Sequence, residues 1–395
     1  MPALFWAGLV LVPTYAAIDV ARFPAPTDFR CFYTAARLVV RGEDPYDRAA
    51  WTRAVGGPAP DGAGIARPSP CRGFDRAGAP LDRFAYPLWT ALLLAPFGLL
   101  SLTTAAAIWV ALTLAGTVAG ILLVWRAMGP PLTSALLFAT VVLTSEPFWL
   151  TLENAQLGGV LLVLAALSIS WAARRRAAAG VTLALLTLKP HLVLLTLATA
   201  VGWAIRRAPA IAISAATTGA GSVLATIALR PEWIGEWLAQ LPGEQGTSGT
   251  FNHGTLWQLA ALWGVPGWIA LALGITLSTA LVWATRRAGG SLADIVAASL
   301  VAGLLLAPYA GSYDHLLLAP AWARILGIAF ASTGAKKVGL LAAVLGCGTL
   351  LPWTLYAIDE SLTALGVIAT AFALVAALSS ASAARAALPT YRGAP

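Results

Sequence analysis

The chain has 395 residues, of which 59% are hydrophobic and only 11% are charged, and its formal net charge is +8. Ordinary soluble domains have an apolar share below or near one half, so this composition excludes a soluble globular protein, and apolar runs near the length of a bilayer crossing recur throughout. The positive charge does not require a nucleic-acid partner, because much of it lies in short Arg and Lys clusters between the apolar runs, where it indicates membrane topology.

The apolar runs predict twelve membrane spans and a cytoplasmic N-terminus. The expected spans are residues 4–20, 104–125, 132–150, 157–173, 178–189, 191–204, 209–229, 266–284, 293–308, 313–330, 338–356 and 361–382. This arrangement places all the basic clusters inside, namely Arg126, Arg174–Arg176, Arg206–Arg207, Arg286–Arg287 and Lys336–Lys337. Segment Tyr86–Leu100 is predicted to be a short helix at the outer interface, because counting it as a span would move the later clusters outside. The first run is expected to remain as a span, since it lacks the basic start of a signal peptide.

The predicted fold class is an all-α polytopic membrane protein with one transmembrane domain over residues 1–395. Two extracytoplasmic loops are expected, at residues 21–103 and 230–265, and the first should carry juxtamembrane helices. Most polar residues fall on the outer side, whereas the spans are nearly free of charge apart from Arg324 and Asp294. Carriers and channels usually place ionisable residues near mid-membrane. The pattern therefore favours a membrane-embedded enzyme that works at the outer surface.

The types of polar residue in the chain limit the kinds of reaction that it could catalyse. The chain has only three His and no metal-binding motif, and it lacks the Gly-rich loop that cradles the phosphates of a soluble nucleotide. Carboxylates, amides, two His at outer helix ends and many Arg remain. This set suits acid/base chemistry on a sugar with a phosphate leaving group. A carboxylate would deprotonate an acceptor hydroxyl, while Arg, Lys or a divalent cation (Mg²⁺ or Mn²⁺) would stabilise the departing phosphate.

Four stretches, in order along the chain, resemble glycosyltransferase family 87, a member of the GT-C group of polyprenyl-phosphate-sugar-dependent enzymes. They are "TDFRCFYTAARLVVRGEDPYD", "FAYPLWTALLLAPFGLL", "ENAQLGGVLLVLAALSISWAARRRAAAGVTLALLTLKPHLVLL" and "SYDHLLLAPAW". The sequence departs from the family pattern at Leu88, where the family has a second Pro, at Ala155 in place of a Gly, and at Gly158 in place of an Asn. The resemblance implies a GT-C-type bundle of about twelve transmembrane helices.

The resemblance also implies a catalytic base at Asp28, just before a helix expected over residues 29–41. An Asp at this position is equally an ordinary helix N-cap, and Asp19 is the rival base. Asp314 and His315 begin a span at the outer surface, where they are expected to take part in catalysis, although helix capping and a snorkelling His are the alternative. Further substrate contacts are expected from Tyr33, Asp44, Asn154, Gln156, Lys189, His191, Asn252, His253 and Arg324. Asp44 also suits a turn, and Arg324 a snorkelling side chain.

The cysteines suggest one covalent link. Cys31 and Cys71 both fall in the first outer loop, whereas Cys347 lies within an expected span. An oxidising exterior permits a Cys31–Cys71 disulfide, which would tie the Asp28 helix to the rest of the loop.

The function that the resemblance implies is transfer of a sugar from a polyprenyl-phosphate donor with inversion at the anomeric carbon. The sugar that the resemblance favours is mannose. The acceptor would be a glycolipid or lipoglycan, and the product would be α-linked. The enzyme would be a multi-pass protein of the plasma membrane, surrounded by membrane lipids, with its active face outside and no nucleic-acid partner. Arabinofuranosyl transfer is the nearest alternative. A lipid-linked sugar flippase or transporter, or a paralogue that only binds, is also compatible with the sequence.

Overall fold

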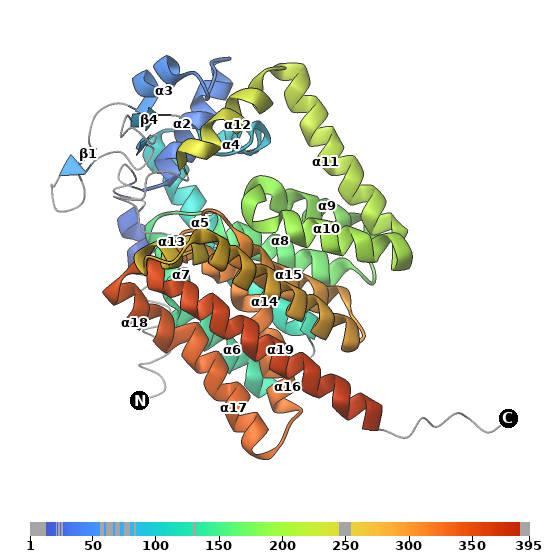
Figure 1. The fold of residues 1–395 in the computed structure, drawn as a ribbon. Helices are drawn as coiled ribbons and strands as arrows, with labels where there is room; N and C mark the ends of the chain where they lie inside the picture. The colour runs from blue at the N-terminus through green and yellow to red at the C-terminus, as the bar shows by residue number, and fades with distance from the viewer. Residues whose placement is uncertain are drawn as a thin grey trace.

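A computed structural model describes residues 13–20, 27–55, 84–128, 132–244 and 254–387. Between these ranges it also describes Arg22, Pro24 and four short strands. All the long elements are helices (Figure 1). Residues 13–20 are helical, and the rest of the first expected span lies outside the described residues.

A group of helices forms a cap at one end of the molecule, at the top of Figure 1. It consists of α2 (Phe29–Val40), α3 (Arg48–Val55), α4 (Leu88–Gly98) and α12 (Trp233–Glu244). The Gly- and Pro-rich chain between α3 and α4 forms two antiparallel strand pairs instead of helix: β1 (Ala59–Pro60) with β2 (Ala66–Arg67), and β3 (Arg72–Phe74) with β4 (Pro80–Asp82). These strands have only two or three residues each, and every longer element of the described chain is a helix, which agrees with the expected all-α fold class.

The remaining helices form the bundle below the cap. They are α5 (Leu102–Met128), α6 (Leu132–Thr144), α7 (Glu146–Glu153), α8 (Gly158–Trp171), α9 (Arg176–Leu185), η1 (Leu186–Leu188), α10 (Pro190–Arg207), α11 (Pro209–Leu229), α13 (Leu256–Leu262), α14 (Gly267–Arg287), α15 (Leu292–Leu306), η2 (Ser312–Leu318), α16 (Ala319–Phe330), α17 (Gly334–Leu345), η3 (Gly346–Leu350), α18 (Leu351–Ile358), η4 (Glu360–Thr363) and α19 (Ala364–Ala387). These segments follow the expected apolar runs closely. In Figure 1, α11 rises along one side and leads into α12 of the cap.

Five helices of the described chain are long and apolar enough to cross a membrane, and a sixth span results if one bent pair is counted. The expected number of twelve is not confirmed. The bent pair is α6 and α7, which meet at 51° where one straight span over 132–150 was expected. Ser145 accounts for the break, because its side chain caps α7 by accepting the Phe148 N–H, and Pro147 follows within the first turn.

The cap helices pack closely against one another and against the bundle. A Cβ on Gly98 of α4 would lie 2.7 Å from the main chain of Ala36 in α2, so only glycine allows this close approach. The ring of Phe29 stacks on Trp109 of α5 at 5.6 Å between centroids. These contacts hold the start of α2 against the bundle.

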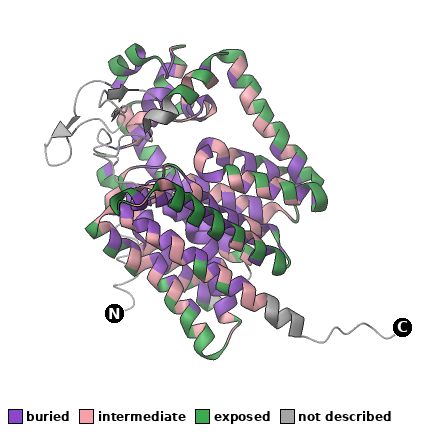
Figure 2. Cartoon of the chain, in the orientation of Figure 1, coloured by how far each residue is buried: buried purple, intermediate pink, exposed green. Residues whose placement is uncertain are grey.

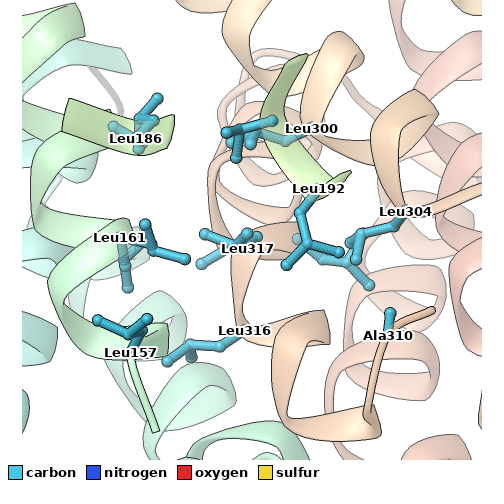
Figure 3. Packing of buried hydrophobic residues seen from close by; sticks show 14 of the residues in the cluster. Leu157, Leu161, Leu186, Leu192, Leu300, Leu304, Ala310, Leu316 and Leu317 are labelled. Carbon is cyan, nitrogen blue, oxygen red and sulfur yellow. The ribbon is translucent and has the colours of Figure 1, made fainter. Parts of the chain in front are cut away.

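Leucines from separate helices fill the bundle core beneath the cap (Figure 3). They include Leu157 just before α8, Leu161 of α8, Leu186 of η1, Leu192 of α10, Leu300 and Leu304 of α15, and Leu316 and Leu317 of η2. Exposed residues instead lie along the outer helices such as α11 (Figure 2). Ile213 and Leu224 on α11 are both more than 60% exposed. An apolar surface of this kind suits contact with lipid chains.

Candidate active site

The carboxylate of Asp28 does not cap the helix that follows it. Asp28 occupies the N-cap position of α2, yet its side chain accepts no hydrogen bond from that helix. Instead Oδ2 of Asp28 accepts a 2.5 Å hydrogen bond from Nε2 of Gln156, which precedes α8. The Asp28 N–H also donates to the main-chain oxygen of Asn154 at 3.1 Å. The N-cap interpretation of this side chain was therefore wrong, and two expected site residues lie in contact.

The turn that presents Gln156 has an unusual backbone. Ala155 has a φ of +50°, a left-handed conformation that glycine adopts at no steric cost. Its carbonyl accepts a 2.7 Å hydrogen bond from Nε1 of Trp109, and the Gln156 N–H donates to the carbonyl of Thr151 at 2.9 Å. Gln156 is only 2% exposed. The family pattern has Gly where this chain has Ala155, and the φ angle explains that preference.

Gly158 is the second departure from the family pattern. A Cβ at this position would lie 2.7 Å from Oγ1 of Thr151. An Asn side chain therefore has no room here unless Thr151 moves. The amide contact that the family pattern suggests is absent at this position of the chain, and Gln156 supplies the amide beside Asp28.

Lys189 and Asp314 form a fully buried ion pair. Nζ of Lys189 lies 2.6 Å from Oδ1 and 2.8 Å from Oδ2 of Asp314, and the two side chains are 0% and 1% exposed. The Gly311 N–H donates to Oδ2 of Asp314 at 3.2 Å, and the ring of Tyr313 lies 4.7 Å from Nζ. Lys189 reaches this place because Pro190 begins α10 and ends the preceding turn.

Asp28 and the ion pair share one electrostatic environment. Burial raises the pKa of the half-buried Asp28 carboxyl from its ordinary 3.8 to about 6. The hydrogen bond from Gln156 and the positive charge of Lys189 lower this pKa, whereas the negative charge of Asp314 raises it. A carboxyl with a pKa near 6 is ionised at neutral pH and is a stronger base than an exposed Asp. The arrangement suits proton abstraction.

Two expected substrate contacts instead hold the cap together. The Tyr33 hydroxyl donates to the Leu100 carbonyl at 2.9 Å. Asp44 pairs with Arg230 at 2.6 Å and accepts the Tyr46 N–H at 2.8 Å. The turn interpretation of Asp44 agrees with the second of these bonds. The structure gives both residues a packing role, and their substrate contacts remain predictions.

The expected site residue Arg324 lies apart from this group. Its Nε is 2.5 Å from Oδ1 of Asp294, near the start of α15. A small cavity there is also lined by Met128, at the end of α5. Since α5 begins beside the cap and runs for 27 residues, this end of the bundle is distant from Asp28. The sequence alone did not show that Arg324 lies at the end of the bundle opposite Asp28.

The two described histidines have different surroundings. His315 is 3% exposed, and its Nε2 lies 2.9 Å from the carbonyl oxygen of Gly254. A Cβ on Gly254 would come within 3.0 Å of that ring, so glycine is needed beside it. His191 packs edge-on against Tyr309, with ring centroids 5.8 Å apart. Asn252 and His253 lie outside the described residues.

Sequence reasoning missed one buried carboxyl close to the site. Glu146 is 0% exposed, and the side chain of Ser312 lies beside its carboxylate. Neighbouring Ser312 donates its N–H to Oε1 of Glu360 at 3.0 Å. The available signal was the Ser-Glu-Pro sequence at 145–147, which marks a helix start inside an apolar run.

No three His, Cys, Asp or Glu side chains of the described chain come together in a way that suits a metal ion. The groups beside Asp28 are an amide and an ammonium group, and this pair does not suit a divalent cation. Cys31 is disulfide-bonded, and Cys347 is a free, buried thiol. Cys71 lies outside the described residues, so the Cys31–Cys71 pairing remains a prediction.

Comparison with known proteins gives one match. The model of glycosyltransferase family 87 matches residues 84–320, which is more than half of the chain. No curated protein and no solved structure matches. The matched range contains Gln156, Lys189 and Asp314. Asp28 precedes it, and the structure brings Asp28 to the matched residues through Gln156.

Proposed function

Because the chain belongs to glycosyltransferase family 87, we propose that it transfers a sugar from a polyprenyl-phosphate donor to a glycolipid or lipoglycan. The sugar that we favour is mannose. The reaction takes place at the extracytoplasmic face of the plasma membrane. The family supports glycosyl transfer by a protein with several apolar helices. The donor, the sugar and the acceptor come from the sequence resemblance. The main structural support for an active site at Asp28 is the hydrogen bond between Asp28 and Gln156.

Asp28 is the proposed general base. Its half-buried carboxylate takes the proton of an acceptor hydroxyl, and that oxygen forms a bond to the anomeric carbon of the donor sugar. The bond between this carbon and the phosphate oxygen breaks, and its electron pair leaves with the lipid phosphate. Attack from the face opposite the phosphate inverts the anomeric centre, so a β-linked donor gives an α-linked product. The pKa of about 6 keeps Asp28 ionised for this step at neutral pH.

The neighbours of Asp28 are positioning residues in this proposal. Gln156 holds one carboxylate oxygen, which leaves the other for the acceptor. The charge of Lys189 favours the ionised base. A direct contact between Lys189 and the donor phosphate would require Asp314 to release the ammonium group, because the pair is closed and buried. Catalytic roles for Asp314 and His315 stay predictions.

The test is transfer of label from polyprenyl-phosphate mannose into membrane glycolipids. Asp28→Asn should abolish incorporation at matched expression, because an amide cannot accept the proton. Asp19→Asn is the matched control, since it removes the same charge from an exposed residue near the same loop, and it should retain activity. Full activity in Asp28→Asn would contradict Asp28 as the base, and loss in Asp19→Asn alone would assign the base to the rival.

Two alternatives give different results in the same assay. An arabinofuranosyltransferase would incorporate label only from the arabinose donor. A lipid-linked sugar flippase would incorporate label from neither donor, and its transport would survive Asp28→Asn. Proton abstraction is needed for transfer only.

A further inference from the structure

A second cavity lies between the ends of three bundle helices, away from Asp28. Its volume is about 620 Å³, within the range of small-molecule sites. It is formed by the C-terminal ends of α10 and α14 and by the first turns of α15. We call it the arginine pocket, and its main lining residues are Trp203, Arg206, Arg207, Arg286, Gly289 and Gly290.

The arginine pocket and the candidate active site lie at opposite ends of α10. Lys189 precedes the first residue of this helix and Arg207 is its last residue. At 1.5 Å per residue, the two positions are roughly 27 Å apart, close to the hydrocarbon thickness of about 30 Å of a bilayer. A ligand in the arginine pocket is therefore not part of the reaction at Asp28.

Of the three arginines that line the pocket, Arg206 and Arg286 have no protein partner for their guanidinium groups in the described part of the chain, whereas Arg207 has one. Arg207 donates to the Gly290 carbonyl at 3.3 Å and lies over the ring of Trp203. Neither a hydrogen bond nor an ion pair is formed by the side chains of Arg206 and Arg286 among the described residues. The lining contains no Asp or Glu. The pocket thus concentrates positive charge that nothing within the described protein neutralises.

Topology alone explains basic residues at this end, but it does not explain a preformed cavity. Arginines are favourable at helix C-termini and on the cytoplasmic side of spans. Here the turn between α14 and α15 is fixed, since Gly289 and Gly290 have φ angles of +84° and +47°. The Trp203 Nε1–H donates to the Gly290 carbonyl at 2.9 Å and ties this turn to α10. The walls are therefore held without a ligand.

We propose that the arginine pocket binds the phosphate headgroup of an anionic membrane lipid. Arg206 and Arg286 pair with the phosphate oxygens, for which the planar guanidinium is well suited. Val282, Ile295 and Ala298 form an apolar wall that takes the first part of the lipid chain. Charge and apolar surface side by side match an amphiphile, whereas a soluble anion would use the charge alone.

Native mass spectrometry of the detergent-solubilised full chain tests this proposal, with phosphatidylglycerol and phosphatidylcholine as probes. Phosphatidylglycerol, which is anionic, should bind more tightly than phosphatidylcholine. The double variant Arg206→Gln/Arg286→Gln should weaken it by about thirtyfold, at about 1 kcal/mol for each basic residue. The matched control is Lys336→Gln/Lys337→Gln, which removes the same charge outside the pocket and should change the affinity by less than about threefold.

A second variant keeps every charge and fills the space. Gly202 lines the pocket, and a Cβ there would have no atom within 4 Å, so Gly202→Trp can begin a large side chain at the wall of the pocket. It should lower phosphatidylglycerol affinity as the arginine variant does. Gly219→Trp on α11, which has the same open surroundings, is its control.

Three outcomes would overturn the proposal. Equal losses in the lysine control would show attraction to a basic surface rather than to the pocket. Unchanged binding in Gly202→Trp would place the lipid elsewhere. Displacement of phosphatidylglycerol by inorganic phosphate at an equal concentration would make the ligand a soluble anion.

Discussion

Nε2 of Gln156 donates a 2.5 Å hydrogen bond to Oδ2 of Asp28, a residue 128 positions earlier in the sequence. This bond joins Asp28, in the part of the first loop that precedes the family match, to the turn before α8, which lies inside the matched range. Its effect on the proposed base can be measured, because the bond favours the ionised carboxylate.

Gln156→Leu should shift the acidic limb of the pH profile of kcat/KM to higher pH. Loss of the hydrogen bond raises the pKa of Asp28, by about one unit for a bond to a charged group, while activity at alkaline pH is largely kept. Asn154→Ala is the control, because Asn154 meets Asp28 through its main-chain oxygen, which the substitution retains. An equal fractional loss at every pH, with the limb unmoved, would mean that Gln156 does not act on the protonation of Asp28.

Asp28→Asn should stabilise the protein at pH values above 6. Folding raises the pKa of Asp28 from 3.8 to about 6, so the folded state favours the protonated form. The stability that this preference gives is complete below about pH 4 and is lost as pH rises through 6. Thermal unfolding at about pH 8 should show a gain of about 3 kcal/mol for the variant. The gain should vanish near pH 4. A gain that is the same at both pH values would contradict this pKa assignment.

Breaking the buried ion pair should be costly. Lys189→Met leaves Asp314 buried without its cation, and the expected loss is about 3–5 kcal/mol of unfolding free energy. The double variant Lys189→Met/Asp314→Leu should recover much of that loss, because no charge is then buried. The exposed Arg53–Glu43 pair is the control, and Arg53→Ala should cost less than about 1 kcal/mol. Similar losses for Lys189→Met and Arg53→Ala would show that the buried pair is not closed in solution.

Ala155→Gly should raise the stability. At a φ of +50° the Cβ of alanine costs about 1 kcal/mol, and glycine removes that cost. Ala155→Val should lower the stability, since a β-branched residue is poorly tolerated at positive φ. Ala216→Gly, at an exposed site within α11, should show the opposite sign, a loss of about 1 kcal/mol. Chemical denaturation of the three variants measures these differences. A loss on Ala155→Gly would mean that the turn is not left-handed.

Glu146→Gln should raise the melting temperature at neutral pH. The carboxyl is fully buried, no cation pairs with it among the described residues, and its neighbour Ser312 can hydrogen-bond a neutral amide equally well. Replacing it with a neutral isostere should therefore gain about 1–3 kcal/mol. Glu153→Gln, an exposed residue on the same helix, should change little. If Glu146→Gln instead unfolded more readily, the carboxylate would have a stabilising partner.

The sequence predicted where helices lie better than how they cross a membrane. Apolar runs fall on the observed helices because burial in a bundle and contact with lipid both require apolar side chains. For the same reason, hydrophobicity alone does not distinguish a short buried helix such as α8 from a full crossing. The break before Glu146 was missed because the apolar pattern continues through it. The deciding signal was local, in a capping serine and a following proline.

The site residues were predicted individually and not as pairs. Lys189 and Asp314 were each expected at the outer surface, but their ion pair depends on how η1 and η2 pack, which no local pattern encodes. Arg324 was grouped with them because an intramembrane charge suggests function, and its actual partner is Asp294. The contact of Asp28 with Gln156 could be found only in the three-dimensional structure, because these residues share no helix or loop.

The composition of the site from distant segments affects how the enzyme is made. Asp28 leaves the ribosome early, and Asp314 follows roughly 290 positions later, which at 5–20 residues per second is about fifteen seconds to a minute. During that interval the first loop has neither the amide of Gln156 nor the ammonium group of Lys189 beside it. Its buried contacts become available only as later helices enter the membrane. A nascent chain that is arrested before η2 would therefore carry the proposed base without its full electrostatic environment.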